Sequence, residues 1–359
     1  MTINQTKKNL SIETLRGIAI TLVVLGHVIG SSSNNGLKVP DESVWRWIYY
    51  AQQYITMPLF TVISGFVYAY KPVSRFTSNS TFLWGKVNRL LIPLIVVSSL
   101  FFVLQYLAPG TNSKSGLDQI WKIYIYPYAV FWFLQGIIIV FIIITVLENF
   151  RLLDNLKPAL VCFAIAAFVF VVLPFKLNYF SLSRVPFLLT FFLLGLLLKR
   201  FYDTMFKKSI TILAAVIFVC AFSCQLYLFN THASRQIVNL LTLCVGSAAS
   251  VLLIRLGFQS KKLTWLGHFS YAIYLFHVFG AVTARIILGK LAVNNLVIQV
   301  MVELAFGLSF PIVLQLLCGS NKLLSVLLFG DKIKTSATGK PAYGFKSFGG
   351  AISSRFFSN

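Results

Sequence analysis

Charged residues are scarce in this sequence, and acidic residues are scarcer still. Only 11% of the 359 residues are charged, and nine residues are Asp or Glu, whereas 57% are hydrophobic. Soluble domains are usually about 25% charged and about 45–50% apolar. The deficit of charge therefore excludes an ordinary globular protein with a large core and indicates an integral membrane protein.

The sequence also lacks cysteine pairs in its polar segments and any processing signal. All five cysteines fall inside apolar runs, which argues against a disulfide framework: Cys162, Cys220, Cys224, Cys244 and Cys318. Two thiols on one helix face make a poor metal site, so we predict packing roles and no metal. Only SSSNNG follows the first apolar run, so we expect no cleavable signal peptide.

Long apolar runs make up most of the sequence. A membrane-spanning helix needs about 20 mostly apolar residues. Ten runs fit this length, near 13–30, 47–70, 90–108, 128–147, 157–174, 184–199, 209–229, 237–257, 269–289 and 295–318. We predict an all-α polytopic membrane protein, a bundle of about ten transmembrane helices in one domain at 1–330. A tail at 331–359, rich in Lys, Ser and Gly, is expected to be disordered.

The distribution of Lys and Arg predicts the orientation of the bundle. If the N-terminus is cytoplasmic, 21 of the 31 Lys and Arg residues fall on the cytoplasmic side and nine on the other, with Arg16 inside the first span. Both termini are then cytoplasmic, and in a bacterium the loops 31–46 and 109–127 face the periplasm. The net charge of +22 is thus explained by topology, and a nucleic-acid partner is excluded.

The first run, RGIAITLVVLGH, carries an ionisable side chain at each end. Arg16 and His27 are eleven residues apart, so they share nearly one helix face and lie about 16 Å apart along the axis. Intramembrane ionisable groups usually face the protein interior or a wet cavity and mark function. The alternative is an Arg that extends to the interface and a His that binds a neighbouring carbonyl.

The spacing of Arg16 and His27 suits a ligand that is anionic at one end and reactive at the other. An acyl-CoA fits, with its phosphates near Arg16, its pantetheine arm threaded into the bundle and its thioester near His27. Histidine can serve as a general base on an acceptor hydroxyl because its ordinary pKa lies near neutrality.

Five motifs, in order along the chain, resemble those of the membrane acyltransferase-3 family, whose members O-acylate bacterial surface glycans. The motifs are IETLRGIAITLVVLGH, MPLFTVISGFVY, FLWGKVNRLLIPL, FWFLQGIIIVF and LGHFSYAIYLFHVF. The resemblance covers most of the chain. Some members carry a fused C-terminal periplasmic domain of the Ser-Gly-Asn-His hydrolase type, and here we expect the stand-alone form.

The resemblance implies roles for the basic residues. Arg16 and His27 match the family's Arg-x10-His pair, which is required for acyl transfer. Lys86 and Arg89 match its basic pair at the cytoplasmic mouth, with Lys where Arg is common, and should hold the CoA phosphates together with Arg16. Ordinary juxtamembrane charge is the alternative explanation. Glu13 is three residues before Arg16 and is expected to pair with it.

The resemblance also implies the reaction. The protein would be a multi-pass O-acyltransferase of the bacterial inner membrane, acting in polysaccharide biosynthesis. It would move an acyl group, acetyl favoured over succinyl, from cytoplasmic acyl-CoA to a hydroxyl of a surface polysaccharide, an exopolysaccharide or a lipid-linked sugar. Acyl-CoA is then a co-substrate, and no cofactor is bound permanently. Membrane lipid and other glycan-synthesis proteins are further candidate partners.

Glu303 is the one acidic residue deep in an apolar run after the first. A carboxylate at that depth costs about 2.5–3.5 kcal/mol on insertion scales, so it needs a partner. Its depth is similar to that of His27, and it could orient the imidazole as the acid of a catalytic triad does. Pairing with Arg285 is the alternative.

For the reaction at His27, direct transfer from the thioester is favoured over an acyl-histidine intermediate.

Five further polar or aromatic residues are candidates for lining an acceptor cavity: Trp132, Gln135, Tyr274, His277 and Ser64. Trp132 could instead be an interface anchor, and His277 a structural hydrogen-bonding residue. Ser64-Gly65, like Met57-Pro58, is expected to break the second helix, which a membrane tolerates where backbone lines a cavity or is buried. No base stands at a recognisable spacing from Ser64, so it is not a nucleophile candidate.

Two other functions remain open on the sequence alone. A transporter of polysaccharide or lipid-linked sugar would also use broken helices and buried charges, but no inverted repeat is visible. An inactive structural subunit of a glycan-synthesis complex would neither bind CoA nor release it. For the enzyme, the acceptor is expected to enter a mouth lined by the loops 31–46 and 109–127.

Overall fold

The computed structural model describes residues 10–107, 116–174, 176–231 and 233–331, and these residues are helical with no strand. Ten helices have at least 16 residues: α1 (Leu10–Ile29), α2 (Val44–Tyr68), α3 (Asn79–Leu107), α5 (Trp132–Asn149), α6 (Leu156–Val172), α7 (Val185–Arg200), α9 (Lys208–Tyr227), α10 (Arg235–Leu256), α12 (Ser270–Lys290) and α13 (Leu296–Cys318). Shorter helices connect them: η1 (Val73–Arg75), η2 (Leu117–Gln119), α4 (Lys122–Ile125), η3 (Ala129–Phe131), η4 (Tyr179–Arg184), α8 (Tyr202–Met205), α11 (Lys261–His268) and α14 (Lys322–Phe329). Apart from Asp331, the predicted tail lies outside the described residues.

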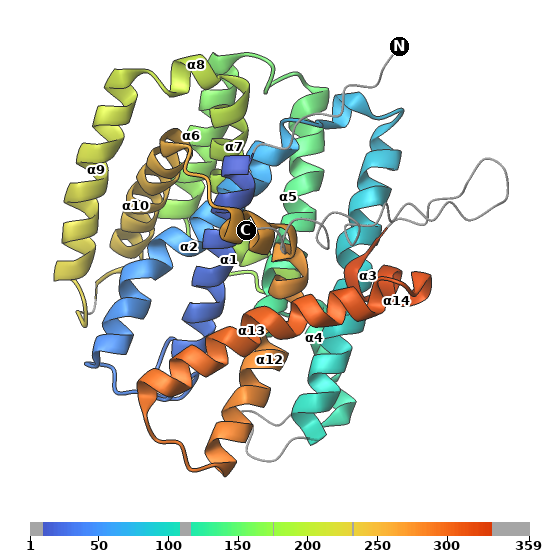
Figure 1. The fold of residues 1–359 in the computed structure, drawn as a ribbon. Helices are drawn as coiled ribbons and strands as arrows, with labels where there is room; N and C mark the ends of the chain where they lie inside the picture. The colour runs from blue at the N-terminus through green and yellow to red at the C-terminus, as the bar shows by residue number, and fades with distance from the viewer. Residues whose placement is uncertain (1–9, 108–115, 175, 232, 332–359) are drawn as a thin grey trace, which may run out of the picture.

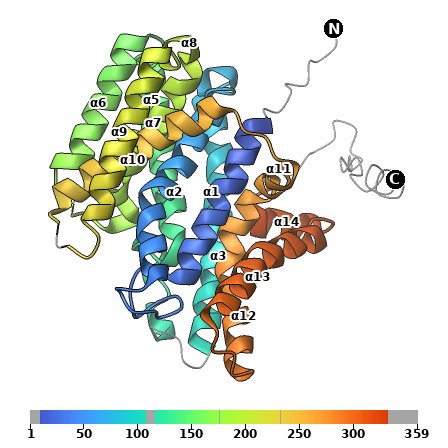
Figure 2. The same cartoon turned by 60° about the vertical axis from the view of Figure 1, so that its left-hand side comes forward.

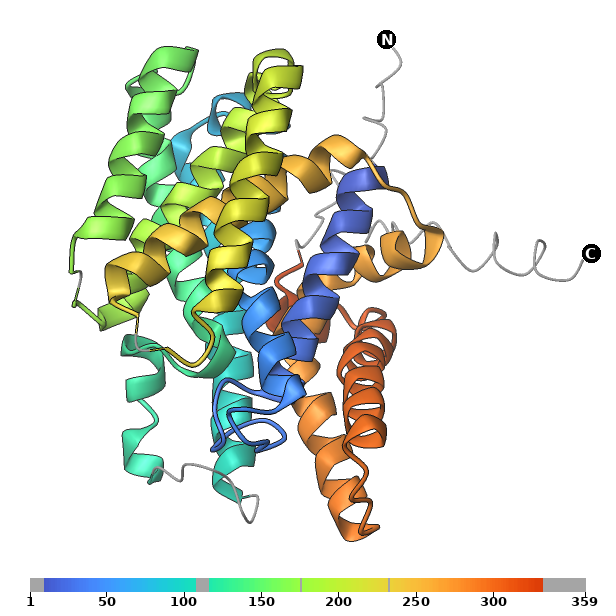
Figure 3. The same ribbon diagram turned by 90° about the vertical axis from the view of Figure 1, so that its left-hand side faces the viewer.

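The long helices form two groups with α1 and α2 between them (Figures 1, 2 and 3). On one side α6, α7, α9 and α10 pack together, and α2 packs along α7 and α10. On the other side α12 packs along α13, and α14 packs against α3. Helix α1 contacts both groups, through α2 and through α12 and α13. Residues on α1 therefore lie at the junction of the two groups.

The ten predicted spans each overlap one long helix. Within the described part of the chain, eight helical segments are long and apolar enough to cross a membrane, and the long helix α2 and the shorter α6 join them in the bundle. This confirms an all-α, multi-pass membrane protein. The largest difference is at α3, which begins at Asn79 rather than near 90, so that Lys86 and Arg89 lie within the helix.

Local sequence explains where several helices begin and end. The side chains of Ser43, Ser234 and Asn295 accept hydrogen bonds from backbone N–H groups in the first turns of α2, α10 and α13. Gly257 and Gly330 end α10 and α14 with φ values of 60° and 64°, a left-handed conformation that glycine adopts at low cost.

The predicted breaks in α2 are wrong, because this helix is continuous from Val44 to Tyr68 with Pro58 inside it. Gly65 instead permits close packing. A Cβ atom on Gly65 would lie 1.9 Å from the Phe192 carbonyl oxygen of α7, and a Cβ on Gly195 would lie 1.9 Å from the Val62 carbonyl oxygen of α2. The two glycines thus let the backbones of α2 and α7 cross in contact, as small residues do between membrane helices.

Candidate active site

Helix α1 carries Arg16 and His27 on one face, as their spacing predicts. The helix is unbroken from Leu10 to Ile29, so the Cα atoms of the two residues are separated by about 16 Å along the axis. The side chain of Arg16 is half-buried, and that of His27 is exposed although the valine and isoleucine that follow it are fully buried. An accessible imidazole in a packed helix is available to a ligand.

His27 faces a second histidine, on α12. The ring centroids of His27 and His277 are 5.0 Å apart, and the planes are inclined by 44°. His277 is fully buried, and its Nδ1 atom lies 2.9 Å from the carbonyl oxygens of both Ile273 and Tyr274. Because carbonyl oxygens only accept, Nδ1 carries the proton and Nε2 is left as an acceptor.

The Nε2 atom of His277 is buried and has no hydrogen-bond partner among the described residues. Buried polar atoms are nearly always paired in native proteins, so an unpaired one needs an explanation. The neighbouring ring is that of His27 on α1.

The structure gives Glu303 the partner that the sequence left as the alternative, Arg285. Its carboxylate is fully buried on α13 and binds the guanidinium of Arg285 on α12 through both oxygens, with the Arg285 Nε atom 3.0 Å from Oε1. An Nη atom of Arg285 also donates to the carbonyl oxygen of Val28 at 3.3 Å. Glu303 therefore does not orient His27 directly, and its ion pair ties α12 and α13 to the backbone beside His27.

Glu13 organises the end of the same face that carries Arg16. An Nη atom of Arg16 donates to Oε1 of Glu13 at 3.0 Å, which is the contact that their spacing predicts. The other oxygen of this buried carboxylate lies 3.5 Å from Nδ1 of His268, at the end of α11. The carboxylate thus holds Arg16 toward the junction of α11 and α12.

Arg89 reaches this junction from α3. Its guanidinium carbon lies 5.5 Å from the ring centroid of Tyr271, whose hydroxyl donates to the Arg89 carbonyl oxygen at 2.6 Å. Lys86, one turn earlier, places its Nζ atom 4.1 Å from the ring centroid of Phe141. Arg16 and Arg89 therefore both approach the α11–α12 junction, whereas Lys86 faces the α5 side. The spacing of residues along the sequence did not reveal that Arg16 and Arg89 approach the same junction.

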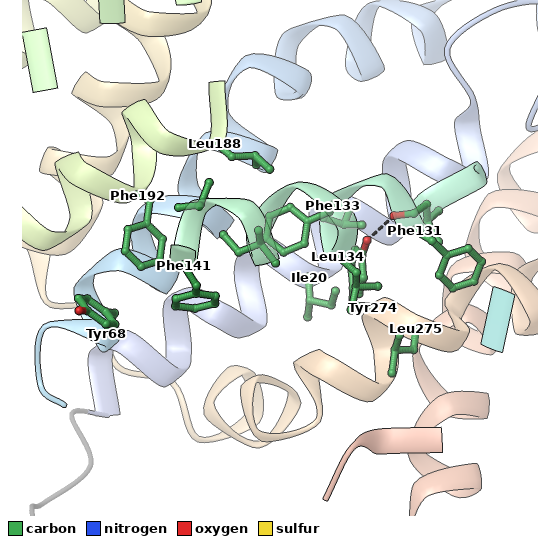
Figure 4. Packing of buried hydrophobic residues seen from close by; sticks show 14 of the residues in the cluster. Ile20, Tyr68, Phe131, Phe133, Leu134, Phe141, Leu188, Phe192, Tyr274 and Leu275 are labelled. Atoms are coloured by element: carbon green, nitrogen blue, oxygen red, sulfur yellow. Dashed lines mark hydrogen bonds between the residues drawn. The ribbon is translucent and has the colours of Figure 1, made fainter. Parts of the chain in front are cut away.

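Packed side chains separate the two ends of this face. Ile20 is fully buried and Val23 is 5% exposed, and both belong to the main hydrophobic core between Arg16 and His27. Figure 4 shows Ile20 beside Leu134 and Tyr274 in that core. The threaded path predicted for the pantetheine arm is thus filled by side chains in this structure.

The predicted acceptor-lining residues have different environments. Tyr274 is buried and donates its hydroxyl proton to the Val130 carbonyl (Figure 4). Gln135 is fully buried and binds backbone carbonyls and Ser181. Ser64 bonds back to the Phe60 carbonyl at 3.0 Å. Trp132 is half-buried, with the Arg184 guanidinium carbon 5.5 Å from its ring centroid.

The described residues form no metal-binding arrangement of side chains. No group of three or more His, Cys, Asp or Glu side chains in that part of the chain has an arrangement that could hold a metal ion. What the arrangement does offer is an exposed imidazole at one end of α1, with a second histidine beside it, and guanidinium groups at the other end.

Comparison with known proteins identifies the family of this chain. Residues 9–318 match the profile of a family described as an acyltransferase domain. The chain is also similar to the nodulation protein NolL of Mesorhizobium japonicum, with 28% identity over 151 residues. That match covers 41% of this chain and 38% of NolL, so it spans less than half of that relative. No solved structure matches the chain. With the family profile covering nearly all of the bundle, the chain belongs to the acyltransferase-3 family and is a multi-pass membrane protein.

Proposed function

We propose that this acyltransferase transfers an acyl group, acetyl in the first instance, from cytoplasmic acyl-CoA to a hydroxyl of a surface polysaccharide, an exopolysaccharide or a lipid-linked sugar. It would act in the inner membrane of a bacterium. The observation that carries the proposal is the accessible imidazole of His27 beside the buried acceptor atom of His277, on the helix face that bears Arg16 at its other end.

The donor's phosphates would bind at the cytoplasmic end. Arg16 and Arg89 both approach the α11–α12 junction, and planar guanidinium groups bind phosphate oxygens in pairs. Lys86 would add a point charge from α3. The 21 to nine division of Lys and Arg supports a cytoplasmic location for this end, where acyl-CoA would be available.

The reaction would take place at His27. Its unprotonated ring nitrogen removes the proton of the acceptor hydroxyl while the hydroxyl oxygen attacks the thioester carbonyl carbon. The carbon–sulfur bond breaks, and the departing CoA thiolate takes the proton from the imidazolium. His277 would accept the other N–H of His27 at its unpaired Nε2 atom, and this bond would orient the base and stabilise its charged form, as the acid of a catalytic triad does.

Donor binding would also require movement in the bundle. Ile20 and Val23 fill the space between Arg16 and His27, so the pantetheine arm can reach His27 only if these side chains shift.

The proposal is tested by CoA release from purified protein in nanodiscs. Acetyl-CoA and succinyl-CoA are supplied in parallel with a crude surface-glycan acceptor. Acceptor-dependent release should fall at least about 10²-fold in His27→Ala, the lower limit for loss of a general base. Binding of CoA itself should persist in this variant, which controls for folding.

A second arm tests the donor site. Arg16→Gln should weaken CoA binding, whereas Lys208→Gln, which removes an exposed cation at the start of α9, should not. If the wild-type protein neither binds CoA nor releases it from either thioester, this assignment of donor and reaction is wrong, and a role in transport becomes the better explanation.

A further inference from the structure

A basic pocket lies at the opposite end of the bundle from the donor site. It has a volume of about 860 Å³, and the residues that line it and matter here are Tyr126, Lys176, Asn178, Ser183, Arg184 and Arg235. They come from the segment before α5, the segment between α6 and α7, and the first turn of α10. The distribution of Lys and Arg predicts that this end faces the periplasm.

The charge of this pocket is unbalanced. Three cations, Lys176, Arg184 and Arg235, line it, and no carboxylate does. None of the three forms a salt bridge within the described part of the chain. The predicted outer side holds only nine of the 31 Lys and Arg residues. Three of those nine line this pocket. Uncompensated cations that converge on one concave site attract an anion.

A buried glutamine fixes the two walls of the pocket relative to each other. The Nε2 atom of Gln135 donates to the Tyr126 carbonyl oxygen at 3.2 Å, while its Oε1 atom accepts from the Ser181 hydroxyl at 2.6 Å. Ser181 and its neighbour Phe180 have φ values of 57° and 47°. Non-glycine residues adopt this conformation only when the surroundings hold them there. The wall that carries Arg184 is therefore preorganised.

The pocket is also connected to the proposed reaction centre. The Arg184 guanidinium lies over the ring of Trp132, which packs against Phe133 with ring centroids 6.1 Å apart. Phe133 in turn lies 5.5 Å from Tyr274, whose carbonyl oxygen accepts from His277. These packed side chains link the wall of the pocket that carries Arg184 to His277, the neighbour of His27.

We propose that this pocket binds the phosphate or pyrophosphate group of a lipid-linked sugar acceptor, with Arg184, Arg235 and Lys176 as its ligands. Three cations match a multivalent phosphate group better than a single carboxylate, and the two guanidinium groups can each bind phosphate oxygens in pairs. This inference rests on the proposed function, because it names the acceptor of that reaction.

Inorganic pyrophosphate is the probe. Its binding to the full chain is measured by calorimetry in nanodiscs of phosphatidylcholine. Arg184→Gln/Arg235→Gln should raise the Kd at least about tenfold, since each guanidinium contributes charge-assisted hydrogen bonds. Lys290→Gln, which removes an exposed cation at the end of α12, is the matched control and should leave the Kd unchanged. Because pyrophosphate could also bind at the donor site, the same binding must survive in Arg16→Gln.

Two results would overturn the inference. An unchanged Kd in the double variant would show that the pocket does not bind the probe. Loss of wild-type binding when phosphatidylglycerol is added to the nanodiscs would identify the pocket as a site for ordinary anionic headgroups. The measurement needs no acyl donor, so its outcome is independent of the CoA-release assay that tests the proposed function.

Discussion

Replacing Glu303 by Gln should loosen the junction of α1, α12 and α13 without disabling His27. The carboxylate binds Arg285 through both oxygens, and Arg285 also donates to the Val28 carbonyl. Removing one partner of a buried ion pair costs about 3–5 kcal/mol. The Arg285 side chain is 33% exposed, so solvent screens part of the lost interaction, and we expect about 2–3 kcal/mol. This corresponds to roughly a 30- to 150-fold change in the unfolding equilibrium.

The assay is unfolding of the purified protein in SDS, followed by circular dichroism. Glu303→Gln should unfold at a lower SDS fraction than the wild type. The double variant Glu303→Met/Arg285→Met should recover most of the stability, because an apolar pair of similar size replaces a buried ion pair at little cost. CoA release per folded molecule should stay near the wild-type rate in Glu303→Gln.

The opposite pattern would refute this reasoning. If Glu303→Gln unfolded like the wild type while its CoA release fell to the level of His27→Ala, the carboxylate would act on His27, as its depth in the sequence first suggests. The stability measurement and the rate measurement therefore distinguish a structural ion pair from a residue that orients the base.

Two further substitutions test other contacts. His277→Ala should lower kcat for CoA release by about 10²-fold, because the oriented base loses its acceptor, while the KM for acyl-CoA stays constant; a changed KM with constant kcat would contradict this role. Gly195→Ala should abolish the yield of monodisperse protein, because its Cβ would meet the Val62 carbonyl oxygen at 1.9 Å. Gly289→Ala, with no atom within 4 Å of the added Cβ, is the control and should purify normally.

The sequence alone predicted the features that depend on position along a single helix. Apolar run length located all ten long helices, because a span of lipid imposes the same length requirement on each one. Helical periodicity placed Arg16 and His27 on one face and Glu13 beside Arg16. These relations are local, so they do not depend on how the helices pack.

Only the tertiary structure decided which residues meet across helices. Glu303 and His277 both lie within apolar runs at depths from which they could reach His27, but the rotation of α12 and α13 turns Glu303 to Arg285 and brings His277 to His27. The sequence predicts a helix break at Ser64-Gly65, whereas in the structure Gly65 allows the α7 backbone to pack directly against α2. A residue's depth follows from its place in the chain, whereas its partner follows from the orientation of another helix, which close packing of the whole bundle determines.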